Sequence, residues 1–200
     1  MTRPRRSVGT ERDKMLRGDL YLATDPDLTA ARTRARHLTR RFNASDPSQR
    51  AVALAILREL LGELGDGAWI EPPFHCDYGS QVRLGAAVFV NMNCTFLDPA
   101  PIEIGDLAQL GPGVQLLTAT HPLDAALRTA GPELARSIRV GARAWLGGGV
   151  IVCPGVAIGA DTVVGAGSVV VRDLPAGVLA VGNPCRVVRA IEPGAASDDA

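Results

Sequence analysis

The sequence has few aromatic residues and no excess of either charge. Phe, Trp and Tyr make up 4% of its 200 residues, although 46% of the residues are hydrophobic. A folded core must therefore be built from Val, Ile, Leu and Ala. Lys and Arg together number 21, as do Asp and Glu, so the formal net charge is zero. Because such a chain does not attract polyanions at long range, binding to nucleic acids or to anionic membranes is disfavoured.

Long apolar runs and paired cysteines are also lacking. No stretch reaches about 18 apolar residues, and the charged start MTRPRRSVGTERDK is not followed by an apolar segment. We therefore expect neither a membrane span nor a secretory signal, and a cytoplasmic protein. The four cysteines contain no Cys-x-x-Cys pair, which indicates reduced structural thiols rather than a disulfide framework. Three histidines at these spacings do not resemble a metal-binding cluster, so no metal is expected.

The composition changes near residue 66, from an Arg-rich segment to one rich in Gly and Val. Leucines at helical spacing predict a helix over about 47–64, with a cap and a first-turn proline supplied by residues 46–48. Asp25 and Pro26 open a second predicted helix over 26–42. The arginines of that helix are interpreted as a solvated face rather than an anion site. Residues 1–10 are expected to form a flexible arm, residues 11–65 a helical cap and residues 193–200 a tail.

A six-residue repeat dominates the rest of the chain. Bulky aliphatic residues recur at every sixth position, each followed in most units by a small residue: Val140, Leu146, Val152, Ile158, Val164 and Val170. An earlier array has the same period, with one two-residue slip: Leu84, Val90, Phe96, Ile104, Leu110 and Leu116. A hexapeptide period is typical of parallel β-helices, in which the aliphatic side chain points inward and the small residue lets the chain turn. The repeat predicts stacked triangular coils.

One segment, residues 118–137, breaks this repeat and is expected to be ejected as a functional loop. His121 opens the loop directly before a proline. Imidazole is well suited to accept a proton near neutral pH, although a single histidine is more often structural. His75 is interpreted as either structural or substrate-facing.

Other polar residues stand where the repeat favours small ones. Asn91 and Asn93 lie in the strand FVNMNC, and an amide there could bind a hydroxyl or orient an imidazole, or form part of an asparagine ladder. Asp77 and Asp98 could both hold sugar hydroxyls, or could each cap a turn.

Several stretches together carry a family resemblance: MLRGDLYLATDPDL and RRFNASDPSQR in the cap, EPPFHCDYGSQVRLG at its junction with the repeats, then FVNMNCTFLD, TATHPLD and the final repeats AWLGGGVIVCPGVAIGADTVVGAGSVVVRDLPAGVLAVGNPCRVVRAI. Over about residues 12–192 the chain resembles the maltose, galactoside and nodulation-factor O-acetyltransferases, a branch of the hexapeptide-repeat acyltransferases. The resemblance implies a mainly β protein, with a left-handed parallel β-helix over 66–192 behind an N-terminal helical cap. It also implies a homotrimer with active sites between subunits.

The resemblance further implies the roles of individual residues. His121 matches the general base. Asn91 and Asp77 match acceptor contacts, and a further acidic contact corresponds either to Asp98 or to Pro99. Contacts to acetyl-coenzyme A (acetyl-CoA) fall at Gly148, Ala166, Val171 and Arg172. Arg186 and Arg189 match the cations that bind its phosphates, a role that suits the guanidinium fork; the alternative for both is a solvated tail.

The expected activity is direct transfer of acetyl from acetyl-CoA to a hydroxyl of a sugar or glycoside, with His121 as base. Acetylation of an antibiotic or another secondary metabolite, and a non-catalytic β-helical trimer module, are the alternatives. The cofactor residues follow position 140, whereas the acceptor contacts precede position 99. Each coil advances about one strand spacing, ~4.8 Å, along the axis, so coils two or more steps apart cannot easily bring both sets to one reactive centre within one chain. We therefore expect a neighbouring subunit to supply Asp77 and Asn91 to a site whose His121 and cofactor groove belong to the next chain.

Overall fold

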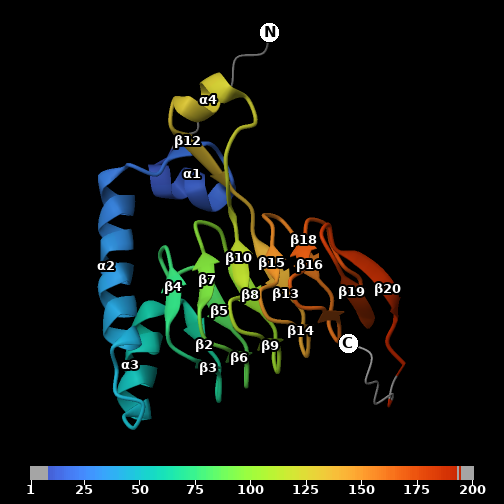
Figure 1. Cartoon of the computed structure of the whole chain (residues 1–200). Coiled ribbons are helices and arrows are strands. Elements are labelled where there is room, and N and C mark those ends of the chain that lie inside the picture. Colours follow the sequence, from blue (N-terminus) through green and yellow to red (C-terminus); the bar gives the residue numbers. More distant parts are fainter. Residues whose placement is uncertain (1–8, 193, 195–200) are drawn as a thin grey trace.

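The computed structural model describes residues 9–192 and residue 194. Most of the predicted arm and all of the predicted tail except residue 194 lie outside the described residues. The first three described helices are α1 (Glu11–Arg17), α2 (Pro26–Asn43) and α3 (Arg50–Leu60). Helices α2 and α3 stand beside a long stack of strands, and α1 lies above it (Figure 1). A short strand, β1 (Tyr21–Leu22), connects α1 to α2. In the part of the chain that is described, no helix is both long and apolar enough to cross a membrane.

Local hydrogen bonds explain where the two longer helices begin. The Asp25 carboxylate accepts the N–H groups of Asp27 and Leu28, and the predicted helix over 26–42 is confirmed as α2. The helix predicted over 47–64 is present as α3, but its predicted bounds are wrong at both ends. The Asp46 carboxylate accepts from the N–H and hydroxyl of Ser48 at 2.8 and 2.7 Å, so these residues form a turn of their own. Residues 63 and 64 pair as a strand, which ends the helical segment early.

The strands form three parallel sheets around one axis, each named here by its first strand. The β2 sheet contains β2 (Glu63–Leu64), β5 (Val82–Leu84), β8 (Ile102–Ile104), β13 (Ile138–Val140) and β16 (Ala157–Ile158). The β3 sheet contains β3 (Trp69–Ile70), β6 (Phe89–Val90), β9 (Gln109–Leu110), β14 (Trp145–Leu146), β17 (Val163–Val164), β19 (Val178–Val181) and the antiparallel β20 (Arg186–Ala190). The β4 sheet contains β4 (Phe74–Cys76), β7 (Cys94–Leu97), β10 (Gln115–Leu117), β15 (Ile151–Val152) and β18 (Val169–Val170).

This arrangement confirms the β-helix that the hexapeptide period predicts. The chain visits the three sheets in turn, so each strand inside a sheet pairs with the strands one coil before and one coil after it. The coils form the left-handed parallel β-helix that the resemblance implies, an exception to the usual right-handed crossover.

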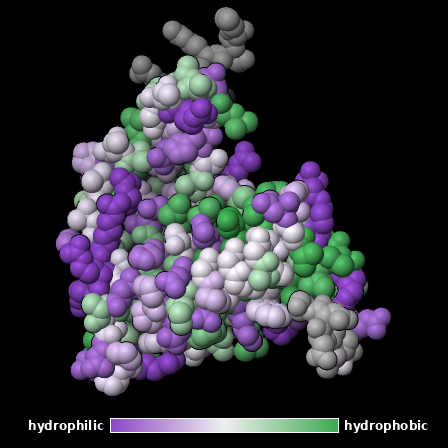
Figure 2. All heavy atoms as spheres, viewed as in Figure 1, coloured by the Kyte–Doolittle hydropathy of each residue, from purple (hydrophilic) through white to green (hydrophobic). Residues whose placement is uncertain are grey.

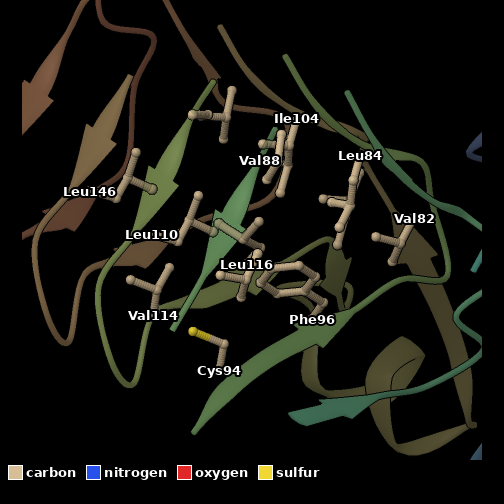
Figure 3. Close-up of a cluster of buried hydrophobic side chains, with 14 of the residues drawn as sticks. Val82, Leu84, Val88, Cys94, Phe96, Ile104, Leu110, Val114, Leu116 and Leu146 are labelled. Atoms are coloured by element: carbon tan, nitrogen blue, oxygen red, sulfur yellow. The ribbon is translucent and has the colours of Figure 1, made fainter. Parts of the chain in front are cut away.

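The repeated aliphatic residues fill the interior of the coils. The six residues from Val140 to Val170 at this period are each exposed by 2% or less. Figure 3 shows inward side chains from successive coils meeting on the axis, Leu84, Leu110 and Leu146 among them. Phe42 and Leu57 of the cap belong to the same buried cluster, so helices cover the first coils. Leu, Ile and Val thus supply the core that the low aromatic content requires.

Small residues at the corners let the coils approach. A Cβ atom added to Gly159 would lie 2.3 Å from the backbone nitrogen of Ala176 in the next coil. No side chain fits in that space, which explains the glycine that follows most of the aliphatic positions.

The outward faces of the sheets differ in character. Along the β2 sheet, charges alternate from coil to coil in the order Glu63, Arg83, Glu103, Arg139. The guanidinium of Arg139 binds the carboxylate of Glu103 at 3.1 Å. We call this series the charge ladder. The outer side of the β4 sheet includes apolar residues such as Ile151 and Val169, and Figure 2 shows hydrophobic residues gathered over β10, β15 and β18.

The segment that interrupts the repeat is ordered by pairing with the cap. It contains β11 (Ala119–Thr120), α4 (Ala125–Thr129) and β12 (Pro132–Ala135). Strand β12 pairs antiparallel with β11 on one side and with β1 on the other. The ejected loop therefore stands above the β-helix as part of a small three-stranded sheet that the N-terminal segment completes (Figure 1).

Candidate active site

Two corners of the β-helix, one on each side of the β4 sheet, carry the residues that the sequence singled out. At the first corner the chain passes from the β3 sheet to the β4 sheet. Four residues stack there: Asn91, Gly111, Gly147 and Gly165. The backbone N–H of each donates to a carbonyl oxygen of a strand in the next coil, at 2.7–2.9 Å. Gly148 and Ala166 come directly after two of them. We call this edge the glycine corner; it aligns Asn91, Gly148 and Ala166.

The second corner lies where the β4 sheet turns toward the β2 sheet. Asp77 follows β4, Asp98 follows β7, and the ejected loop with His121 follows β10. Leu97 lies opposite Leu117, which sets these turns one above the other. Val171 and Arg172 follow β18 at the same edge. We call this edge the loop corner.

A polar cavity of about 250 Å³ opens at the loop corner, between the cap, the first turns and the ejected loop. Its walls are formed by Tyr21, Ala23, Arg32, Arg36, Asp77, Tyr78, Pro99 and Glu133. Arg32 of α2 donates to the hydroxyl of Tyr78 at 2.7 Å, and the hydroxyl of Tyr21 donates to the carboxylate of Glu133 at 3.1 Å. These two bonds connect all three segments that make the cavity.

Charges of both signs face each other across this cavity. Burial raises the pKa of Asp77, whereas the guanidinium groups of Arg32 and Arg36 lower it and the carboxylate of Glu133 raises it. Burial, followed by the charge of Glu133, also raises the pKa of Tyr21 far above its ordinary value, so the phenol stays a hydrogen-bond donor. The cavity therefore offers both donors and acceptors, as recognition of a hydroxyl-rich molecule requires.

Asp98 does not line the cavity. Its side chain is fully buried, and its carboxylate accepts N–H groups of the turn that follows β4. Pro99 lines the cavity instead. The resemblance allowed a further acidic contact at either Asp98 or Pro99. The position that faces the cavity holds proline, and the carboxylate of Asp98 is buried and structural, so the expected acceptor contact from Asp98 is wrong.

His121 is exposed and comes directly after β11. Thr120 lies opposite Leu134 in the antiparallel pair, so the next residue, His121, lies near the strand that carries the cavity residue Glu133. On the glycine corner, Asn91 accepts the N–H of Met92 with its own side-chain oxygen at 2.8 Å. The NH₂ group of Asn91 can then donate to a ligand.

The remaining predicted residues are placed more simply. Asn93 adopts a φ of 63°, and the preference of asparagine for this left-handed conformation explains its presence without a ligand. His75 is exposed on the outer side of the β4 sheet, opposite Thr95. Arg186 and Arg189 lie on β20, at the C-terminal end of the β3 sheet. Among residues 9–192 and 194, no group of three or more His, Cys, Asp or Glu could hold a metal ion.

Within one chain, the predicted acceptor contacts fall into two groups. Asp77 lies at the loop corner, beside the segment that carries His121. Asn91 lies at the glycine corner with Gly148 and Ala166. Sequence separation alone does not define these groups, because residues about 20 positions apart stack directly in a β-helix.

Sequence reasoning also missed several residues of the cavity. Tyr21, Arg32, Arg36 and Glu133 were not predicted as site residues, and the arginines of α2 were interpreted as a solvated face. The spacing of Arg32 and Arg36, four residues apart on one helix face, was the available signal. Their role depends on how the cap sits against the first coil, which no local pattern encodes.

A capped β-helix of hexapeptide repeats with an ejected, histidine-bearing loop defines the class of hexapeptide-repeat acyltransferases. Residues 14–65 match the family model described as the maltose acetyltransferase hexapeptide capping motif. Nodulation protein L of Rhizobium meliloti (strain 1021) is 47% identical over 89% of this chain and 97% of its own length. Among solved structures, a maltose O-acetyltransferase from Clostridium difficile 630 superposes with a TM-score of 0.91 at 45% identity, covering 93% of this chain and 100% of that chain.

A galactoside acetyltransferase solved in complex with coenzyme A superposes with a TM-score of 0.89 at 34% identity, covering 92% of each chain. The chain belongs to the family of maltose, galactoside and nodulation-factor O-acetyltransferases.

Proposed function

We propose that this protein transfers the acetyl group of acetyl-CoA directly to a hydroxyl of a sugar or glycoside, with His121 as the general base. The observation that carries the proposal is the cavity at the loop corner, whose donors and acceptors suit an acceptor rich in hydroxyls, beside a segment with an exposed imidazole. The coenzyme A complex of the similar galactoside acetyltransferase supports the choice of donor.

In the proposed reaction, Nε2 or Nδ1 of His121 takes the proton of the acceptor hydroxyl as its oxygen attacks the thioester carbonyl. The carbon–sulfur bond then breaks, and the imidazolium returns the proton to the departing thiolate. The products are the acetyl ester of the acceptor and free coenzyme A. General-base assistance of this kind contributes ~10²–10⁴ in rate.

The donor is proposed to lie along the glycine corner. Gly148 and Ala166 present little side-chain bulk there, and Asn91 stands two coils before Gly148, ~10 Å along the axis. A long thioester laid along this edge would bring its acetyl end to the amide of Asn91. Val171 and Arg172 at the loop corner, and Arg186 and Arg189 on β20, are proposed to bind the remainder of the donor, with the arginines on its phosphates.

A homotrimer with shared sites would bring the two corners together. The chain turns at Asn93 and is extended only over β7 (Cys94–Leu97), whose four residues span ~13 Å between the two corners. Two side chains that bind one reacting hydroxyl must lie within ~6 Å of each other. The loop corner of one chain against the glycine corner of the next would meet this requirement. The apolar residues on the outer side of the β4 sheet, such as Ile151 and Val169, support burial between chains.

Each of the four cysteines is free, which supports a reducing compartment, and we propose that the protein acts in the cytoplasm.

Thiol release from acetyl-CoA, measured with a panel of sugars, glycosides and hydroxylated antibiotics, tests the function. His121→Ala should lower turnover by ~10²–10⁴, whereas His37→Ala, which removes an exposed histidine from the cap, should not change it. Undiminished turnover in His121→Ala would refute the mechanism. Turnover only with antibiotics would show that the acceptor is an antibiotic and not a sugar or glycoside. The absence of both acetyl-CoA binding and turnover would favour a non-catalytic module.

A further inference from the structure

Two polar side chains lie beneath the cavity without touching solvent. Asp98 and Thr118 are both fully buried, each at the end of a different strand of the β4 sheet. Burying polar groups is costly unless they are hydrogen-bonded, so their partners indicate what they hold in place.

Asp98 holds the turn that forms one wall of the cavity. Its Oδ1 accepts the N–H groups of Asp77 and Tyr78 at 3.1 and 2.8 Å, and its Oδ2 accepts the N–H of Gln81 at 3.3 Å. Asp77 and Tyr78 both line the cavity, and Tyr78 is in turn the acceptor for Arg32. One buried carboxylate thus fixes the backbone from which two cavity side chains project.

Thr118 holds the next turn in the same way. Its hydroxyl donates to the carbonyl of Leu97 at 2.8 Å and accepts the N–H of Ala100 at 3.0 Å. These two bonds bracket the turn that carries Asp98 and the cavity residue Pro99. Thr118 also comes three residues before His121, at the point where the chain leaves the β-helix.

We propose that Asp98 and Thr118 are positioning residues, which together fix the geometry of the acceptor cavity relative to the loop that carries His121. This inference rests on the proposed function and extends it. The hydrogen bonds run without interruption from the cavity wall at Asp77 and Tyr78, through Asp98 and its turn, to the root of the ejected loop. Neither residue touches the acceptor, so each acts on acceptor binding through the backbone that it holds.

The electrostatics of Asp98 are consistent with this role. Burial raises the pKa of Asp98 to about 7, although the backbone N–H groups that donate to it act in the opposite direction. Asp77 raises it further, and the thiol of Cys76 is a second titratable neighbour. Burying this carboxylate costs folding free energy that an apolar residue at the same position would not cost.

The test separates binding of the acceptor from binding of the donor. Thr118→Val removes the hydroxyl while keeping the shape, and we expect the KM for the acceptor to rise about tenfold, as for one lost buried hydrogen bond. The KM for acetyl-CoA should stay within about twofold, since the hydroxyl of Thr118 bonds neither to the glycine corner nor to Val171 and Arg172. Thr118→Ser, which keeps the hydroxyl, should restore the acceptor KM.

Thr162→Val is the matched control. Thr162 is also fully buried, and its hydroxyl donates to the carbonyl of Pro175 at 2.7 Å, far along the β-helix from the cavity. It should lower stability as Thr118→Val does but leave the acceptor KM unchanged. Equal changes in the two KM values, or the same acceptor effect from Thr162→Val, would overturn the inference.

Asp98→Asn gives an independent test, because its NH₂ group cannot accept an N–H of the turn. It should raise the acceptor KM at least as much as Thr118→Val, whereas Asp106→Asn, which alters a carboxylate bound to the N–H of Ala86, should not. If Asp98→Asn does not fold, the Thr118 series decides. A wild-type protein without turnover on any acceptor would refute the proposed function itself, whereas an unchanged acceptor KM in Thr118→Val would refute only this inference.

Discussion

Mixing two inactive variants is the sharpest test of a shared site, because the two corners assign each residue to one side of the interface. His121→Ala damages the loop corner and leaves the glycine corner intact. Asn91→Ala does the reverse. If each site takes one corner from each of two neighbouring chains, a mixed trimer contains sites in which both corners are intact.

The amount of restored activity follows from the geometry. At equal amounts of the two chains, a site is intact when the chain that supplies its glycine corner carries His121→Ala and the chain that supplies its loop corner carries Asn91→Ala. Each condition holds for half of the chains, so random mixing restores about a quarter of the sites. Restored activity should be greatest in the equal mixture and should decrease when either variant is in excess.

The assay is thiol release from acetyl-CoA after the two variants are unfolded together and refolded. The matched control is a mixture of His121→Ala with Asp77→Ala. Both residues lie at the loop corner, so no mixed trimer contains an intact site and no activity should return. Activity in that control, or none in the first mixture, would refute the division of the site that the structure supports.

Three further predictions concern stability. Gly159→Ala should lower the free energy of unfolding by ~1–3 kcal/mol, because its Cβ would lie 2.3 Å from the nitrogen of Ala176; an unchanged urea midpoint would contradict the close stacking of coils. Phe96→Ala should cost ~3–5 kcal/mol by the same measurement, since Phe96 is fully buried and packs edge-on to Phe74 at 5.1 Å between ring centroids. Finally, the pKa of Asp98 in the folded protein lies near 7, above its value in the unfolded chain. The stabilisation that protonated Asp98 gives to the folded state is therefore fully present below pH ~4 and is lost as the pH rises to 7. Wild-type stability should therefore fall by on the order of 4 kcal/mol relative to Asp98→Asn across that range, and a slope of opposite sign in urea unfolding at pH 4.5 and 7.5 would refute the assignment.

The hexapeptide pattern predicted the β-helix well because each repeat fixes its own local geometry. A bulky residue such as Leu146 can point only inward, and the glycine after it is required by the approach of the next coil. The same local information located the ejected loop, because the repeat stops and resumes around it.

The acceptor cavity could not be predicted in the same way. Asp98 and Pro99 are adjacent in sequence, yet one is buried and the other lines the cavity. Only the register of the turn against Thr118 decides which of the two faces outward. Likewise, Tyr21 and Glu133 are 112 residues apart and meet because β1 pairs with β12, a contact between cap and loop that neither segment encodes alone.

The charge ladder on the β2 sheet also limits how this β-helix can change in length. Loss of the coil that contains Arg83 would bring Glu63 opposite Glu103, and like charges directly opposite each other are destabilising. Loss of two successive coils would instead bring Glu63 opposite Arg139 and restore an attractive pair. Along the coils from Glu63 to Arg139, the alternation of sign therefore favours the gain or loss of coils in pairs; it ends at Ala157, which lies opposite Arg139.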